Sequence, residues 1–474
     1  MFSHSPIDWA LLVLYFIVLG VVWLRARHAS TRTVDYLVAG RAVTLPAFVA
    51  TLVASWYGGI LGVGEYSYRY GISNWLVFGV PYYLGALLFA LFFARRARRT
   101  ELFTVPQLLQ ERYGRGPALV GALAVFALAS PSAYVLMLGT LFASMFQLPL
   151  VPCVIAAAVF SIFYIQNGGM RSVVFSDQIQ FVLMYVGFFV MFGFLVAQHG
   201  GLGYLHSHLP PAHFTWNGGN PAGAVLVWYF IALSTLIDPG FWQRAYAAKD
   251  PKTAQRGVLI SIAFWILFDF LTTFTGLYAR AALPHLSQPV FAFPELAKVT
   301  LPAGALGLFY LAMIATVMST IDAYGFIAAT TLGRDVVGAL WPAGAEQRAT
   351  RNSKIGLWVS AAFACAVALA EPSVVEIWKL MGSIVTPALL LPVATAILGR
   401  GRLGPGATLW AMVIPLVLTL AWTLCGSLSF FGKPPGYPGS IEPIYVGLAA
   451  SFLFYVTGWL APSRARLVPQ EIPS

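Results

Sequence analysis

The chain has little charge for its length, and the charges that it has are unequal in sign. Only 9% of its 474 residues are charged, with 17 acidic against 28 basic side chains, whereas 59% are hydrophobic. A water-soluble domain carries far more charge on its surface, so this composition excludes an ordinary soluble protein. The chain has just three cysteines, Cys153, Cys365 and Cys425, all in apolar segments without CxxC or CxxH spacing. They indicate neither a disulfide framework nor a structural metal site.

Long apolar runs dominate the sequence instead. Many approach the ~20 residues that a helix needs to cross ~30 Å of hydrocarbon, and uninterrupted runs of this length favour helices over barrel strands. We therefore predict an all-α polytopic membrane protein with thirteen transmembrane helices. The predicted spans are 7–24, 44–70, 73–94, 117–145, 150–167, 173–198, 221–246, 257–283, 303–331, 354–370, 372–399, 405–428 and 442–461.

The basic residues support this count because they alternate between the two sides. With the N-terminus outside, 23 of the 28 Lys and Arg residues, Arg244 among them, fall on the inner side. This asymmetry predicts a C-terminus in the cytoplasm and fits a bacterial inner membrane. It also assigns the basic charge to topology, so we expect a lipid bilayer as partner and no nucleic acid.

Two predicted spans are interrupted near their middles by glycine or proline. They contain ASWYGG at 54–59 and STLIDPG at 234–240, and they lie five helices apart. An odd offset makes the second unit enter the membrane from the opposite side, as in an inverted repeat of broken helices. We predict one membrane domain over 1–474, with an extra first helix (7–24), a first repeat (44–198), an inverted second repeat (221–399) and two extra helices (405–461).

Acidic residues at membrane depth are costly and therefore candidates for function. The candidates are Glu65, Asp177, Asp238, Asp269 and Asp322. The spacing of Glu65 and Arg69 favours an ion pair at the membrane surface. Asp238 is expected to cap the turn before Pro239 or to pair with Arg244.

The remaining acidic residues have polar neighbours in sequence. Asp269 precedes Thr272 and Thr273, which favours an internally satisfied carboxylate, while Asp322 ends the small-residue run ATVMSTID at 315–322. Such a run offers hard oxygen ligands for an alkali cation, although hydroxyls in membrane helices commonly bond their own backbone. No HExxH, GxSxG or GxGD motif is present, so we do not expect an enzyme.

Several motifs in order make the chain resemble the sodium/solute symporter family. They are DYLVAGR (35–41), ASWYGG (54–59), YRYG (68–71), GGMRSVVFSDQIQ (168–180), FWQRAYAAKDPKTAQRG (241–257) and ATVMSTID (315–322). The resemblance implies a LeuT-type fold and a sodium (Na+) site between the second and ninth helices. Its ligands would be the carbonyls of Ala54, Tyr57 and Thr316 and the hydroxyls of Ser319 and Thr320.

The resemblance also places Asp177 near a second cation or proton position. Asp322 stands where some family members have hydroxyls, so we expect Asp177 and Asp322 to face each other around a second cation. Without a cation, two such carboxylates would repel and one would hold a proton.

The expected substrate cavity is rich in aromatic side chains. Its predicted lining is Trp56, Gly58, Gly59, Tyr82, Tyr83, Ser130, Tyr134, Trp228, Tyr229, Ser234, Trp378 and Lys379. Lys379 would hold a substrate carboxylate, snorkel outward or pair with Glu376. We therefore expect a small carboxylate, an amino acid or a related metabolite rather than a sugar.

Together these patterns predict a monomeric, sodium-coupled secondary active symporter that imports a small polar solute by alternating access. Two alternatives stay open. One is a proton-coupled transporter of the same fold, and the other is a non-transporting membrane sensor or regulatory protein, which the short tail after 461 does not favour.

Overall fold

The computed structural model describes residues 5–26, 32–371, 373–399, 403–427 and 436–460, and this part of the chain is almost entirely helical. The only β pairing within it is one isolated bridge between Val43 and Ala248. The elements of the first half are α1 (Pro6–Ala26), α2 (Thr33–Val38), η1 (Ala39–Arg41), α3 (Leu45–Trp56), α4 (Ile60–Tyr70), η2 (Trp75–Gly79), α5 (Val80–Leu88), η3 (Phe89–Ala94), α6 (Arg95–Thr100), α7 (Val105–Tyr113), α8 (Arg115–Leu128), α9 (Ser132–Phe146), α10 (Leu150–His199), α11 (Leu202–His208) and η4 (Pro211–Phe214). Those of the second half are α12 (Ala222–Ile231), η5 (Ala232–Leu236), α13 (Pro239–Ala247), α14 (Pro251–Ala282), η6 (Pro289–Phe291), α15 (Ala292–Thr300), α16 (Ala305–Thr330), η7 (Thr331–Val336), α17 (Val337–Leu340), α18 (Ala345–Ala370), α19 (Val374–Ile397), α20 (Pro405–Ser427), η8 (Pro438–Ser440) and α21 (Pro443–Leu460).

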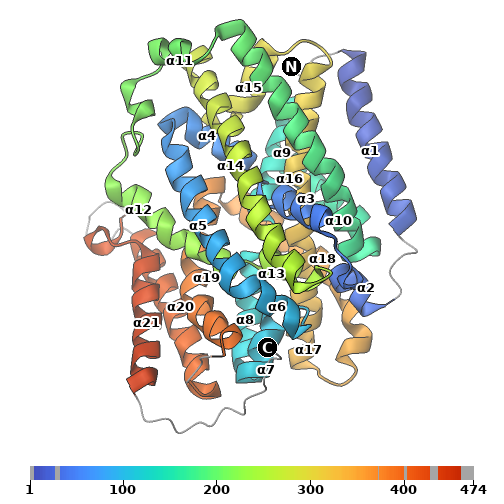
Figure 1. Cartoon of the computed structure of the whole chain (residues 1–474), viewed down its shortest axis with the longest axis vertical. Helices are drawn as coiled ribbons and strands as arrows, with labels where there is room; N and C mark the ends of the chain where they lie inside the picture. The colour runs from blue at the N-terminus through green and yellow to red at the C-terminus, as the bar shows by residue number, and fades with distance from the viewer. Residues whose placement is uncertain (1–4, 27–31, 372, 400–402, 428–435, 461–474) are drawn as a thin grey trace.

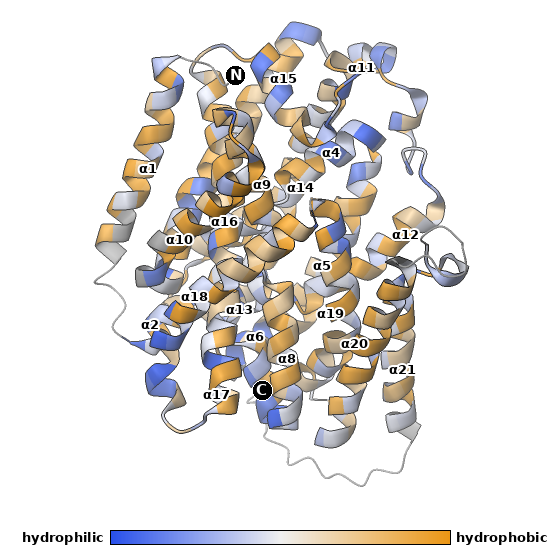
Figure 2. Ribbon diagram, turned by 180° about the vertical axis from the view of Figure 1, so that it is seen from behind, coloured by the Kyte–Doolittle hydropathy of each residue, from blue (hydrophilic) through white to orange (hydrophobic). Residues whose placement is uncertain are grey.

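The helices form one upright bundle in which apolar residues occupy the middle and polar residues the two ends (Figures 1 and 2). Within the described residues, nine helices are long and apolar enough to cross a membrane, and the bent pair α3–α4 makes ten. Three shorter apolar stretches, Pro6–Val21, Leu150–Ile162 and Pro443–Gly458, lie where the first, fifth and last spans were predicted. The chain is therefore a multi-pass membrane protein, while the count of thirteen and the inverted repeat stay predictions.

Most predicted boundaries agree with the helices to within a few residues, but some helices run further. The third span was predicted to end at 94, yet helix continues through the basic α6 to Thr100, and α18 begins at Ala345 rather than 354. Hydropathy marks only the part of a helix that contacts hydrocarbon, so polar turns that extend the helix into water escape it.

The helix α16 forms the centre of the bundle. Every residue from Phe309 to Thr330 is buried, and α1, α3, α10 and α18 pack around it. Its N-terminus is held by α1, because Asp8 Oδ1 accepts the backbone N–H groups of Gly304 at 2.7 Å and Gly307 at 2.8 Å. Polar side chains of α16 therefore face protein rather than lipid.

The apolar surface lies on the outer helices instead. Exposed apolar side chains include Leu91 and Phe92 of η3 and Phe452 and Leu453 of α21. A soluble protein would bury such residues, whereas lipid solvates them.

The fifth and sixth predicted spans are joined in one kinked helix, and a glycine allows the kink. Helix α10 runs through both the fifth and the sixth predicted spans, with a kink at Gly169, whose φ of 58° favours glycine. A Cβ on Gly169 would also lie 2.5 Å from the carbonyl oxygen of Tyr36. The kink therefore lets α2 approach α10 closely.

Candidate functional site

The break between α3 and α4 presses directly against α16. The two helices are bent by 59° across Tyr57, Gly58 and Gly59. A Cβ on Gly58 would lie 2.2 Å from Thr320 Oγ1, and one on Gly59 would lie 2.0 Å from the ring of Trp378. Both glycines are therefore required by close approach of the backbone to other helices. The predicted interruption of the second span is confirmed.

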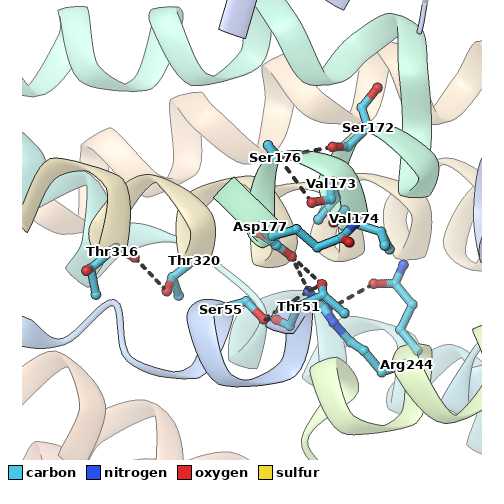
Figure 3. A network of polar contacts seen from close by, with 12 residues as sticks. Thr51, Ser55, Ser172, Val173, Val174, Ser176, Asp177, Arg244, Thr316 and Thr320 are labelled. Carbon is cyan, nitrogen blue, oxygen red and sulfur yellow. Dashed lines mark hydrogen bonds and ion pairs between the residues drawn. The ribbon is translucent and has the colours of Figure 1, made fainter. Parts of the chain in front are cut away.

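Oxygen atoms of α16 face this break. Thr320 Oγ1 donates to the carbonyl oxygen of Thr316 across 3.4 Å, which is long for a hydrogen bond (Figure 3). The Ser319 hydroxyl is buried beside the Asp177 carboxylate and, within the described residues, has no hydrogen-bond partner of normal geometry. Hydroxyl oxygens without a strong hydrogen bond can coordinate a hard cation, and a helix carbonyl such as that of Thr316 keeps a second lone pair for one.

The other predicted sodium ligands come from the broken helix itself. Ala54 lies in the last turn of α3, and its carbonyl oxygen accepts a hydrogen bond from the Tyr57 backbone N–H at 3.4 Å. Through Gly58 the structure brings this break beside Thr320, while coordination by Ala54, Tyr57 and Thr316 stays a prediction. Ser319 extends the set of predicted ligands toward Asp177.

A buried ion pair lies next to these oxygens. Asp177 of α10 and Arg244 of α13 are both completely buried, and Arg244 Nη2 lies 3.5 Å from Asp177 Oδ2. Thr51 donates its hydroxyl to the same carboxylate oxygen, and Arg244 Nη2 also donates to Ser55 Oγ at 3.0 Å. Figure 3 shows these side chains converging between α3, α10 and α13. The pair therefore ties the first broken helix to the second.

This ion pair corrects one sequence prediction and decides between two alternatives in another. Arg244 was grouped with inner-side basic residues, yet it is fully buried in the bundle, and its ion-pair partner is Asp177 rather than Asp238. The available signal was the apolar and aromatic context of FWQRAYA at 241–247, where a lone cation predicts a buried partner.

Asp322 lies one turn beyond Ser319 and is also completely buried. Neither of its carboxylate oxygens has a hydrogen-bond partner within the described residues. The hydroxyl of Tyr15 interacts electrostatically with both Asp322 and Asp177 and accepts a hydrogen bond from Gln180 at 3.0 Å. The two carboxylates therefore share one neighbourhood, in which only Asp177 has a basic partner.

A central cavity lies beside the broken helices. Its volume is about 140 Å³. It is lined by Trp56, Tyr57, Gly59, Val63, Phe78, Tyr82, Leu128, Ser130, Ala133, Tyr134, Ile231, Ser234, Asp238, Asp269, Tyr324, Ile377, Trp378, Met381 and Gly382. Of the predicted substrate residues, Trp56, Gly59, Tyr82, Ser130, Tyr134, Ser234 and Trp378 belong to this lining.

Five predicted substrate residues lie outside the lining. Gly58 faces Thr320. Tyr83 donates its hydroxyl to Asp269, which itself lines the cavity. Trp228 packs against Phe78 with ring centroids 4.7 Å apart, and Tyr229 belongs to the same apolar cluster. Sequence periodicity places a residue on a helix but does not decide which neighbouring helix covers it.

Lys379 is the fifth of these residues, and the structure does not bring it to the cavity. Its ammonium group lies 2.9 Å from Glu442 Oε1 and 5.8 Å from the ring centre of Tyr437. The predicted partner Glu376 is three residues away on the same helix, but the ion pair forms with Glu442 of the loop before α21. The prediction of a carboxylate substrate depended on Lys379, and this side chain is engaged outside the cavity.

Asp238 and Asp269, which the sequence predicted to be structural, both line the cavity. Asp238 Oδ1 caps α13 by accepting the backbone N–H groups of Gly240 at 2.8 Å and Phe241 at 3.2 Å, which confirms the predicted capping role. Its other oxygen accepts the hydroxyl of Tyr324 at 2.8 Å. The signal for this residue was its position inside the interrupted STLIDPG segment.

Asp269 differs from the prediction in its partners. Its two oxygens accept the hydroxyls of Tyr57 and Tyr83. Thr272 instead donates to backbone oxygens of its own helix, and Thr273 accepts from Asn74 at 2.9 Å. Because Tyr57 belongs to the α3–α4 break, Asp269 connects the cavity to the predicted sodium ligands.

In the last turns of α4, the predicted ion pair between Glu65 and Arg69 is confirmed at 2.9 Å. No group of three or more His, Cys, Asp or Glu side chains that could hold a transition metal occurs in the described part of the chain.

Comparisons with known proteins agree with this arrangement. The sequence model of the Sodium:solute symporter family matches residues 36–414. Sodium/myo-inositol cotransporter 2 of Mus musculus is 26% identical over 399 residues, which cover 73% of this chain and 58% of that protein. The chain thus spans less than two thirds of the cotransporter's length.

Two further relatives carry other substrates in their names. The Sodium/pantothenate symporter of Escherichia coli K12 is 25% identical over 352 residues, covering 69% of this chain and 71% of that protein. High-affinity choline transporter 1 of Drosophila melanogaster is 24% identical over 465 residues, covering 91% and 73%.

Solved structures show the same fold. A substrate-bound outward-open Na+-coupled sialic acid symporter superposes with a TM-score of 0.79 at 15% identity, covering 97% of this chain and 99% of that one. Mhp1, a nucleobase-cation-symport-1 family transporter, superposes with a TM-score of 0.58 at 14% identity, covering 94% and 97%. At these identities the likeness concerns the fold alone.

Proposed function

The chain belongs to the sodium:solute symporter family, and from that premise we propose that it is a sodium-coupled secondary active symporter that imports a small polar solute. The observation that carries the proposal is the contact between the α3–α4 break and the hydroxyl-bearing turn of α16 beside a central cavity. Broken membrane helices that expose backbone oxygens at a cavity are the usual setting of sodium sites in this class of fold.

Sodium would be held by the carbonyl oxygens of Ala54, Tyr57 and Thr316 and the hydroxyl oxygens of Ser319 and Thr320. The weakly engaged Thr316–Thr320 pair and the unpartnered Ser319 hydroxyl support this set. Because the ion would join α3–α4 to α16, binding favours whichever state keeps those helices together, and release follows when they separate. The driving force for sodium entry is the sodium gradient together with the membrane potential, which contributes ~2.3 kcal/mol per charge per 100 mV.

We place the first repeat at 44–198 and the inverted second repeat at 221–399, in a bacterial inner membrane with the N-terminus outside and the C-terminus in the cytoplasm. Helix α1 begins at one end of the bundle and α21 ends at the other, which supports termini on opposite sides (Figure 1). The substrate proposal keeps an amino acid but drops a simple carboxylate, because Lys379 is paired with Glu442.

The experiment is thermal unfolding of the detergent-purified protein in sodium against potassium and caesium chloride. Sodium at ten times its Kd is expected to stabilise the folded state by about 1.4 kcal/mol. Ser319→Ala and Thr320→Ala should lose this stabilisation. Thr330→Ala, which removes a buried hydroxyl bonded to Ile327 O further along α16, should keep it. Equal stability in all three salts, or stabilisation that survives both ligand variants, would overturn the proposal.

A proton-coupled transporter is the second candidate, and the unpartnered buried Asp322 favours it. In that case solute binding would depend on pH, and Asp322→Asn would remove the dependence. Retained sodium dependence without any pH effect would reject this alternative.

A further inference from the structure

The central cavity combines negative charge with aromatic walls. Of its lining residues, seven are aromatic (Trp56, Tyr57, Phe78, Tyr82, Tyr134, Tyr324 and Trp378), two are acidic and none is basic. We propose that this cavity recognises its solute through an ammonium or alkylammonium group, placed between the aromatic walls and the carboxylates of Asp238 and Asp269. This inference rests on the proposed function, because it names the substrate class of the transport cavity.

Neither carboxylate has an ion-pair partner within the described residues, although the charge of Arg244 acts on Asp238 from a greater distance. Asp238 is 7% exposed and Asp269 is 2% exposed, and no ion pair among the described residues involves either. Arg244, the buried cation on α13, is committed to Asp177. An unpaired buried charge is strongly unfavourable, so a cationic group in the cavity would supply the missing partner.

Hydrogen-bond donors at each carboxylate oppose the cost of burying its charge. Asp238 accepts two backbone N–H groups and the hydroxyl of Tyr324, and Asp269 accepts the hydroxyls of Tyr57 and Tyr83. All of these donors are neutral, so they orient and stabilise a carboxylate without cancelling its charge. A cationic group bound beside the carboxylates would favour the charged form further.

Four of the aromatic rings follow one another in contact, and two more form a pair. Trp378 lies 5.9 Å from Phe78 and 6.3 Å from Tyr134, and Tyr134 lies 5.9 Å from Tyr324, between ring centroids. Across the cavity lining, Trp56 lies 5.9 Å from Tyr82. Faces of Trp and Tyr attract ammonium groups, most strongly where water is excluded.

Other solute classes fit this lining poorly. A carboxylate without an ammonium group would meet two negative charges and no basic side chain. A polyol needs many hydroxyl and amide partners, yet the only aliphatic hydroxyls of the lining are Ser130 and Ser234, and Ser130 Oγ is already 2.5 Å from Ser132 Oγ. The lining therefore selects for charge and shape more than for hydrogen-bonding groups.

The test compares probes that differ in one property, using thermal unfolding of the whole purified protein in saturating sodium. Choline and its uncharged carbon isostere 3,3-dimethylbutan-1-ol have nearly the same shape, and L-proline carries its ammonium group in a zwitterion. Lactate and myo-inositol carry no ammonium group. We expect stabilisation by choline, L-proline or both, which distinguishes an alkylammonium from an amino acid, and none from the other three. Stabilisation by lactate, myo-inositol or the uncharged isostere, or no effect of any probe, would overturn the inference.

Variants locate the effect. Asp269→Asn and Asp238→Asn should weaken the binding of the stabilising probe by at least about 30-fold while sodium alone still stabilises both proteins. Asparagine at 238 retains the helix cap. The matched control is Asp250→Asn, which alters the cap of α14 outside the cavity and should leave probe binding unchanged. Unchanged binding in both cavity variants would contradict the proposal.

Trp378→Leu provides a measurement that does not depend on the folding of the carboxylate variants. It keeps apolar bulk but removes the ring, so probe binding should fall about threefold to 30-fold. A wild-type affinity in this variant would count against the aromatic contribution. Probe binding without any requirement for sodium would reject the sodium coupling proposed above and leave the ammonium preference standing, so the two failures are distinguishable.

Discussion

Removing one partner of the buried ion pair between Asp177 and Arg244 should be among the most destabilising single substitutions in this chain. We consider replacing Asp177 with Asn, which keeps the shape of the side chain but removes its charge. Both partners are 0% exposed, and their charged atoms lie 3.5 Å apart. At an effective dielectric constant of about 20, two unit charges at this distance attract by about 5 kcal/mol.

The loss on substitution is expected to be about 3–5 kcal/mol, because Arg244 would remain buried with only neutral partners. Those partners are Thr51, Ser55 and Gln243, which accept from its guanidinium at 3.4, 3.0 and 3.4 Å. Arg244→Gln should cost a similar amount because it leaves Asp177 uncompensated. The double variant should be clearly more stable than the sum of the two single effects predicts.

The assay is a double-mutant cycle on the free energy of unfolding in detergent, measured in potassium so that sodium binding does not contribute. The control cycle uses Glu65→Gln and Arg69→Gln. That pair is closer, at 2.9 Å, but its side chains are 28% and 47% exposed, so its coupling should stay below about 1 kcal/mol. Additive effects of Asp177→Asn and Arg244→Gln, or equal coupling in the two pairs, would refute the reasoning that burial decides the strength.

Two further predictions concern residues away from the cavity. Asp8→Ala should destabilise the protein by about 1–3 kcal/mol in the same unfolding assay, because the buried N–H groups of Gly304 and Gly307 lose their acceptor, whereas Asp8→Asn should lose less; equal stability of Asp8→Ala and the parent would contradict this. Burial lowers the pKa of His213 below its ordinary 6.5, and its ring donates from Nε2 to the Tyr68 carbonyl at 3.0 Å. Its contribution to stability is therefore complete above about pH 6.5 and is lost as the pH falls through the lowered pKa, so His213→Gln should flatten the melting temperature over that acidic range, and an unchanged pH profile would argue against it.

Local patterns determined much of the architecture. Apolar runs place the membrane helices because hydrocarbon solvates only continuous apolar surface, and ASWYGG and STLIDPG predict the broken helices because glycine and proline interrupt the backbone ladder. The ion pair of Glu65 and Arg69 was also predictable, since residues four apart share one face of a helix. In each case either the interacting residues are near in sequence, or contact with lipid determines the structure.

Partners that are distant in the chain were decided by the tertiary structure alone. Lys379 pairs with Glu442, 63 residues away, rather than with its neighbour Glu376, and Asp269 is held by Tyr57, 212 residues earlier. Arg244 reaches Asp177 because α13 and α10 both pack against α3. A sequence states which charges and hydroxyls exist. A buried group, however, takes the partner that helix packing places within hydrogen-bonding distance. The same packing sets the acidic and aromatic character of the cavity.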